Sequence, residues 1–110
     1  MKELTAAPAA ACLALTALFA IPALGATTRT VSVKDSFFSP KSLTVTKGTK
    51  VKWVWRGALA HNVVLQKGPA TFSSGRPKVK GTYTRTLTRR GSYRIICEIH
   101  PGMRLTIKVR

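Results

Sequence analysis

The chain has 110 residues, which gives room for a single domain and excludes a multi-domain enzyme. Its 19 Lys and Arg residues oppose only three acids, for a formal net charge of +16. A cationic exterior of this strength favours acidic partners or anionic envelope surfaces, although a solvated basic surface with no steering role fits the same numbers.

Residues 1–26 have the pattern of a signal peptide. Lys2 opens them, an apolar segment runs from Ala6 to Leu24, and small residues at 23–26 offer a cleavage site. An uncleaved membrane anchor is the alternative, but the clean apolar core is shorter than the ~20 residues that a span needs. We therefore expect a periplasmic or secreted protein with no membrane span after cleavage, and a mature domain at 27–110.

The mature domain alternates apolar and polar positions between Gly and Pro breaks, which is typical of short β-strands. We expect turns at 37–40 and at 47–48. A fourth strand is expected to begin near His61. The expected inward-facing side chains of the first four strands are Val31, Val33, Leu43, Val45, Val51, Trp53, Trp55, His61, Val63 and Leu65.

Residues 66–80 are rich in Gly, Pro and Ser and predict a surface loop, with room for a short helix or an edge strand. Residues 82–88 predict an edge strand, because Arg85 shares a face with Tyr83 and Leu87. Two more strands follow, with Tyr93, Ile95, Cys97, Leu105, Ile107 and Val109 facing inward. Seven or eight short strands without a repeat favour an all-β Greek-key β-sandwich, with a small closed barrel as the alternative.

The candidate site lies in residues 97–103, Cys-Glu-Ile-His-Pro-Gly-Met. An extended backbone would spread Cys97, His100 and Met103 over roughly 20 Å, so the Pro-Gly pair is needed to turn the three side chains towards one point. His61, far upstream, is the candidate fourth donor. Glu98 should face outward by strand alternation, and we assign it no catalytic role.

Two imidazoles, one thiolate and a weak thioether suit copper in both oxidation states, whereas structural zinc usually has four strong donors. Taken singly, each residue has a simpler explanation: a surface histidine, a Met in the core, or a Cys97 thiol that is inert or bridges to another chain. However, both His, the only Cys and the only Met of the mature domain fall in this one set. The sequence therefore predicts one copper site made by His61, Cys97, His100 and Met103.

The sequence resembles the small cupredoxins, the plastocyanin, pseudoazurin and amicyanin group. The motif Cys-x-x-His-x-x-Met at 97–103 is similar to amicyanin-type spacing, and His-Asn-Val at 61–63 is similar to the upstream motif of the family. Weaker likenesses at 38–40, 45–48, 51–53 and 91–93 extend the resemblance across the mature domain. Two residues depart from the common pattern: Trp55 stands where relatives commonly have Asn, and Leu105 stands where many have Gly.

The resemblance implies a type 1 (blue) copper protein that carries one electron. His61, Cys97 and His100 would be the close ligands and Met103 the axial one. By the same resemblance Asn62 would join the two ligand loops, and His100 would pass electrons at the protein edge, through a patch with Pro101, Gly102 and Leu59.

Three other functions are alternatives to electron transfer. Copper storage or delivery in the envelope uses the same residues, and an adhesive sandwich would use only the basic surface. An enzyme is not expected, because the mature chain has too few His and acids to spare. We expect redox partner proteins that are acidic, no nucleic acid, and a monomer.

Overall fold

The computed structural model describes residues 27–110; the expected signal peptide at 1–26 lies outside the described residues. Within 27–110 the chain forms strands and no helix, so this part contains no helical segment that could cross a membrane. The strands are β1 (Thr28–Lys34), β2 (Phe37–Ser39), β3 (Ser42–Val45), β4 (Thr49–Trp55), β5 (Val64–Lys67), β6 (Thr82–Leu87), β7 (Gly91–Ile96) and β8 (Arg104–Val109).

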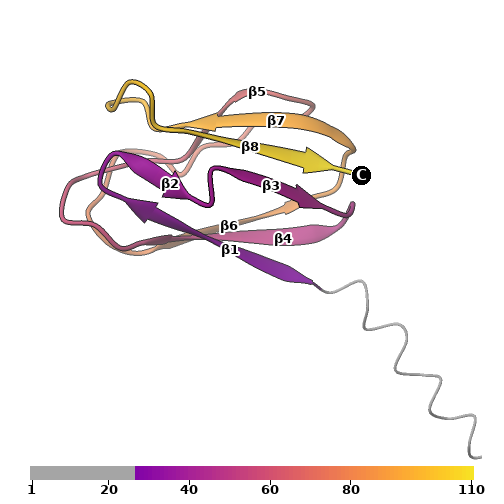
Figure 1. Cartoon of the computed structure of the whole chain (residues 1–110), viewed down its shortest axis with the longest axis horizontal. Coiled ribbons are helices and arrows are strands. Elements are labelled where there is room, and N and C mark those ends of the chain that lie inside the picture. Colours follow the sequence, from indigo (N-terminus) through magenta and orange to yellow (C-terminus); the bar gives the residue numbers. More distant parts are fainter. Residues whose placement is uncertain (1–26) are drawn as a thin grey trace, which may run out of the picture.

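The eight strands form two four-stranded sheets, in the orders β2-β1-β4-β6 and β3-β8-β7-β5, which pack face to face (Figure 1). Strands β1 and β4 run parallel, as do β3 and β8, while the other pairs are antiparallel. This arrangement confirms the predicted all-β sandwich. It also places the β1–β2, β4–β5 and β7–β8 connections at one end of the sandwich, on the left in Figure 1.

The alternating side chains explain why these segments form strands that bury one face. Along β4 every second residue is buried, and Lys50 and Lys52 face solvent. Trp53 is the largest fully buried side chain of residues 27–110 and packs against Phe72 and Tyr83. β6 is an edge strand, as predicted, and Leu105 is a core residue with no exposed surface.

One predicted turn is wrong. Phe37–Ser39 is a short strand paired with β1, and the chain reverses earlier, at Asp35 and Ser36. Ser36 adopts a φ of 69°, a left-handed conformation that is compatible with reversal of the chain within two residues. The Gly and Pro signals on which the prediction relied are absent from this turn, and the conformation depends on a serine instead.

The predicted fourth strand begins later than expected. β5 starts at Val64, and His61 lies before it in an irregular stretch with a single bridge to Lys78. His61, Asn62 and Val63 are all buried, so the alternation of a half-buried strand does not hold there. The predicted loop at 66–80 is confirmed except at its start, because β5 continues to Lys67. After Lys67 the segment contains no strand and no helix, only isolated bridges.

Candidate metal centre

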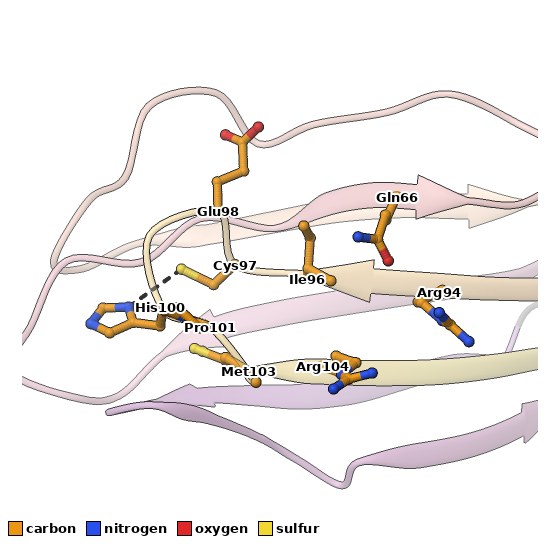
Figure 2. Close-up of a pocket in the computed structure, with 10 residues that line it drawn as sticks. Gln66, Arg94, Ile96, Cys97, Glu98, His100, Pro101, Met103 and Arg104 are labelled. Carbon is orange, nitrogen blue, oxygen red and sulfur yellow. Dashed lines mark hydrogen bonds between the residues drawn. The ribbon is translucent and has the colours of Figure 1, made fainter.

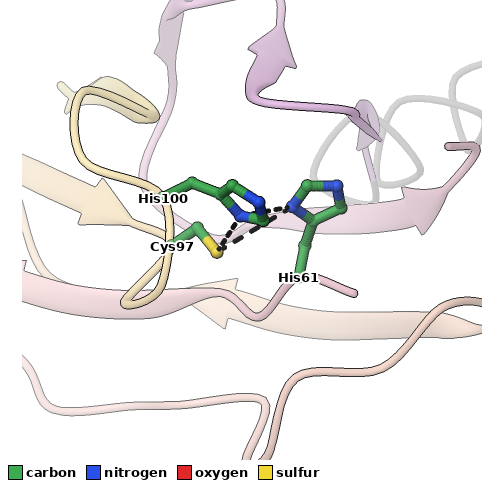
Figure 3. Close-up of side chains that lie close together, drawn as sticks. All are labelled: His61, Cys97 and His100. Atoms are coloured by element: carbon green, nitrogen blue, oxygen red, sulfur yellow. Dashed lines mark hydrogen bonds between the residues drawn. The ribbon is translucent and has the colours of Figure 1, made fainter. Parts of the chain in front are cut away.

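Three potential metal-binding atoms meet at the loop end of the sandwich (Figure 3). The Nδ1 atoms of His61 and His100 lie 3.1 Å apart, and the Cys97 Sγ lies 3.5 Å from the His100 Nδ1 and 3.9 Å from the His61 Nδ1. Nitrogen and sulfur donors that each lie about 2.0–2.3 Å from one ion, at the angles of roughly 110–120° of a tetrahedral or trigonal site, are about 3.3–4 Å apart. The three side chains therefore fit a common ion with little movement.

The loop between β7 and β8 brings Cys97, His100 and Met103 together by local hydrogen bonds. The Cys97 N–H donates to the Met103 carbonyl (3.2 Å), and the Met103 N–H donates to the His100 carbonyl (3.0 Å). Gly102 has a φ of +88°, which L side chains rarely adopt, and this allows the tight return. Figure 2 shows the Met103 side chain on the same side of the loop as Cys97 and His100.

The backbone of His61 is held from two directions. Its N–H and carbonyl exchange hydrogen bonds with Lys78, both at 2.9 Å. The buried Trp55 indole also donates to the His61 carbonyl at 2.9 Å, and the Lys78 ammonium lies 4.6 Å from the centre of the Trp55 ring. The departure at Trp55 from the common cupredoxin pattern therefore has a structural role, because it anchors the segment that carries His61.

The His61 ring is oriented by Asp35, a residue that carries no functional signal in the sequence. Its Nε2 lies 3.0 Å from the Asp35 Oδ1, so an Nε2–H donates to the carboxylate and leaves Nδ1 free as a metal donor. Asp35 also accepts hydrogen bonds from the Ala58 and Leu59 N–H groups, at 2.9 to 3.1 Å. A side chain on Gly57 would place its Cβ 2.3 Å from the Asp35 Oδ1, so this approach requires glycine.

These contacts keep Asp35 ionised. Hydrogen bonds from the Ala58 N–H, the His61 ring and the Leu59 N–H, in that order of effect, lower the pKa of Asp35 from 3.8 to about 2. A fixed negative charge therefore lies on the far side of the His61 ring from Cys97. Such a carboxylate makes an imidazole a better metal ligand.

Asn62 joins the two ligand-bearing loops, as the resemblance implied. Its Oδ1 accepts a hydrogen bond from the Glu98 N–H (2.9 Å), and its Nδ2 donates to the Glu98 carboxylate (2.8 Å) and to the Gly75 carbonyl (3.0 Å). Glu98 is exposed, as expected. However, sequence reasoning missed its carboxylate as a partner of Asn62, because strand alternation says nothing about a contact across loops.

The site is buried on one side and open on the other. His61 has no exposed surface and Cys97 and Met103 are almost fully buried, whereas His100 is half-buried. The chain neighbours of His100 are exposed at Pro101 and Gly102, and Ile99 exposes 51% of its surface. Leu59, which is 50% exposed, lies in the segment whose N–H groups bind Asp35. The His100 ring is therefore the part of the cluster nearest to solvent.

A β-sandwich with two His and one Cys clustered at one end and a nearby Met defines the cupredoxin class of copper proteins. Residues 26–110 match the profile described as copper binding proteins, plastocyanin/azurin family. The chain belongs to this family and, as a cupredoxin, is a type 1 copper protein with one copper ion.

The relatives agree with this assignment. Plastocyanin A/B of Petroselinum crispum is 31% identical over 74 residues, covering 59% of this chain and 76% of the plastocyanin. A reduced Cu(I) amicyanin variant has a TM-score of 0.67 at 29% identity, covering 76% of this chain and 82% of amicyanin. A Cu-containing nitrite reductase from Thermus scotoductus SA-01 has a TM-score of 0.65 at 29% identity over 76% of this chain, but the match spans only 22% of that enzyme.

Proposed function

We propose that this protein carries single electrons between redox partners in the cell envelope, with copper bound by His61, Cys97, His100 and Met103. The observation that carries the proposal is the convergence of two imidazole nitrogens and one thiol sulfur within 4.8 Å of one another. Copper supplies a one-electron couple when bound to such a set.

The protein's own contribution is to hold the donors in place before the metal binds. Asp35 orients the His61 ring, Asn62 ties the two loops together, and hydrogen bonds within the loop position Cys97 relative to Met103. Donors that need not move when the charge of the ion changes permit fast outer-sphere transfer. No substrate is transformed, and we propose no catalytic residue.

Electrons would enter and leave through the His100 edge, which is the exposed part of the cluster. We propose acidic redox partners, because the net charge of +16 accelerates their encounter with this chain. The proposal also includes export by the signal peptide at 1–26 and a monomeric mature protein at 27–110. Recovery of envelope protein that begins near Thr27 would support export.

Direct voltammetry of the copper-loaded protein tests the proposed function. We expect one reversible couple with one electron per copper, and retention of copper in both oxidation states. Copper storage or delivery is the competing function of the same residues. Weak copper retention without a reversible couple would contradict electron carriage and favour delivery.

A further inference from the structure

The end of the sandwich opposite the metal centre, which we call the distal pole, consists of residues 46–48, 88–90 and Arg110 (on the right in Figure 1). Backbone hydrogen bonds hold these three segments together. The Lys47 N–H donates to the Arg110 carbonyl and the Gly48 N–H donates to the Leu87 carbonyl, both at 2.8 Å. The turn between β3 and β4 therefore lies beside both the turn between β6 and β7 and the end of β8.

Four cationic side chains gather at the distal pole: Lys47, Arg89, Arg90 and Arg110. Gly91 pairs with Val109 in the antiparallel ladder of β7 and β8, so the next residues outward, Arg90 and Arg110, lie opposite each other. All four side chains are exposed, and within residues 27–110 none of them makes a hydrogen bond or an ion pair. Their donors are available to an external anion.

Neither acidic side chain of residues 27–110 lies near the distal pole. Asp35 contacts His61 and Glu98 lies in the ligand loop, so both are at the metal-centre end. Strand β7 runs from one end to the other, and at about 3.3 Å per residue it places Gly91 roughly 20 Å from Cys97. This separation exceeds the Debye length of ~8 Å at physiological ionic strength. The distal pole is therefore a centre of positive charge that the two acids do not neutralise.

The distal pole is poor in apolar surface, which indicates the kind of anion that it binds. The large hydrophobic side chains exposed within residues 27–110 are Phe37, Leu59, Val79 and Ile99, and none belongs to the pole. A specific protein interface needs buried apolar or aromatic anchors at its centre. A layer of lipid phosphates needs only cations close to it, and guanidinium groups bind phosphate oxygens through paired hydrogen bonds. These side chains therefore fit an anionic bilayer surface better than a second protein.

The chain also enters the domain at the distal pole. Thr28, the first residue of β1, pairs with Lys50 shortly after the turn at 46–48. The apolar segment from Ala6 to Leu24, which we expect to enter the membrane during export, ends shortly before Thr28. Export by this segment would bring the distal pole to the bilayer surface. A membrane is therefore the polyanion that the order of the chain favours.

We propose that the distal pole binds the anionic phospholipid surface of a membrane, with Lys47, Arg89, Arg90 and Arg110 contacting lipid phosphates. This binding holds the domain with the His100 edge directed away from the bilayer. The inference does not depend on the proposed electron-carrier function, because the distal pole shares no residue with the metal centre and the binding involves no electron exchange.

Co-sedimentation of the copper-loaded envelope protein with phospholipid vesicles tests the proposal. Vesicles with equal amounts of phosphatidylglycerol and phosphatidylcholine provide an anionic surface, and pure phosphatidylcholine provides a neutral one. In Arg90→Gln/Arg110→Gln we expect the affinity for anionic vesicles to fall at least about tenfold, because two charges leave the contact surface. Lys47→Gln/Arg89→Gln should show a similar loss and excludes a folding defect peculiar to one variant.

Arg76→Gln/Arg104→Gln is the matched control, because it removes two exposed arginines at the metal-centre end. Arg76 follows Gly75, whose carbonyl binds Asn62, and Arg104 follows Met103. Both positions are more than a Debye length from a membrane bound at the distal pole. The control should therefore lose less than about threefold in affinity for the anionic vesicles.

Nuclear magnetic resonance of the copper(I) protein locates the contact. With anionic vesicles that contain lipids spin-labelled at the headgroup, we expect line broadening of the amides of Lys47, Arg90 and Arg110. The amides of Ile99 and His100 should remain sharp, because the distal pole faces the lipid. Broadening centred on His100 would contradict the proposed orientation and overturn the proposal.

Four results of the vesicle measurements would also overturn it. The first is an equal loss of affinity in the pole variants and the control, and the second is binding to neutral vesicles as tight as to anionic ones. The third is loss of vesicle binding in inorganic phosphate at constant ionic strength, which would identify a site for the free anion. The fourth is tighter binding to alginate, an anionic polysaccharide, than to anionic vesicles at equal charge.

Discussion

The two sides of the metal centre are built differently. Cys97, His100 and Met103 lie within seven residues and are held by hydrogen bonds inside their own loop. His61 is held by Asp35 from the β1–β2 turn, by Trp55 from β4 and by Lys78 from the long loop. One side is thus local and partly open, and the other is buried and assembled from distant segments. In this metal centre, a local motif positions Cys97, His100 and Met103, whereas tertiary contacts position His61.

The largest expected effect is on the local side. Replacing Cys97 with Ala removes the only thiol within residues 27–110, so we expect complete loss of the blue absorption with the β-sandwich intact. Visible absorption and far-ultraviolet circular dichroism measure the two outcomes. An unaltered visible spectrum would refute the thiolate assignment.

Glycine substitution of each histidine compares the open side with the buried side. In His100→Gly, added imidazole should enter from solvent and restore much of the visible absorption, because His100 is half-buried. In His61→Gly, imidazole should restore little, because the position has no exposed surface and its ring is held by Asp35. Absorption titrations with imidazole provide the measurement, and equal rescue of both variants would contradict the difference in access.

Asp35→Asn tests the buried side of the metal centre, where distant segments hold His61. The amide keeps one acceptor but loses the negative charge behind His61, so copper affinity should fall by about 10- to 100-fold and the reduction potential should rise. Competition with a copper chelator and voltammetry measure these effects. Glu98→Gln is the matched control: it makes the same change in charge near the site, but at a residue bound to Asn62 rather than to a ligand.

The control should change copper affinity by less than about threefold, since it touches no donor atom. Gly57→Ala is a second test of the Asp35 carboxylate, because the added Cβ displaces this carboxylate without altering the charge of the protein. It should weaken copper binding in the same direction, and combining it with Asp35→Asn should add little. An Asp35→Asn effect no larger than that of Glu98→Gln would show that the Asp35 carboxylate does not support His61.

The difference between the local side and the distant side of the metal centre explains which features the sequence could predict. The alternation of residues such as Val51 and Trp53 predicted the sandwich, and the short spacing from Cys97 to Met103 predicted their meeting, because both signals are local. Asp35 was not predictable, because a single acid after an alternating strand looks like any solvated turn residue. The start of β5 was misplaced because His61 is buried by contacts with Trp55 and Asp35, not by membership of a strand.

The smallest expected effect concerns acid stability of the metal-free protein. The pKa of Asp35 is lowered to about 2 in the folded state from 3.8. Its ionised form therefore stabilises the fold above about pH 4, and this stabilisation is lost as the pH falls through 4 towards 2. Thermal unfolding between pH 5 and pH 2 should show a shallower loss in Asp35→Asn than in the native protein or in Lys34→Gln. Identical pH dependence in all three would contradict the role of the carboxylate.

Visible and electron paramagnetic resonance spectra of the copper-loaded native protein test the proposed ligand set most directly. We expect an intense visible absorption from the Cys97 thiolate to Cu(II), with the spectrum of a type 1 site and one copper per chain. A colourless Cu(II) protein, with a resonance spectrum that reports nitrogen and oxygen ligands alone, would contradict the binding of one ion by His61, Cys97 and His100.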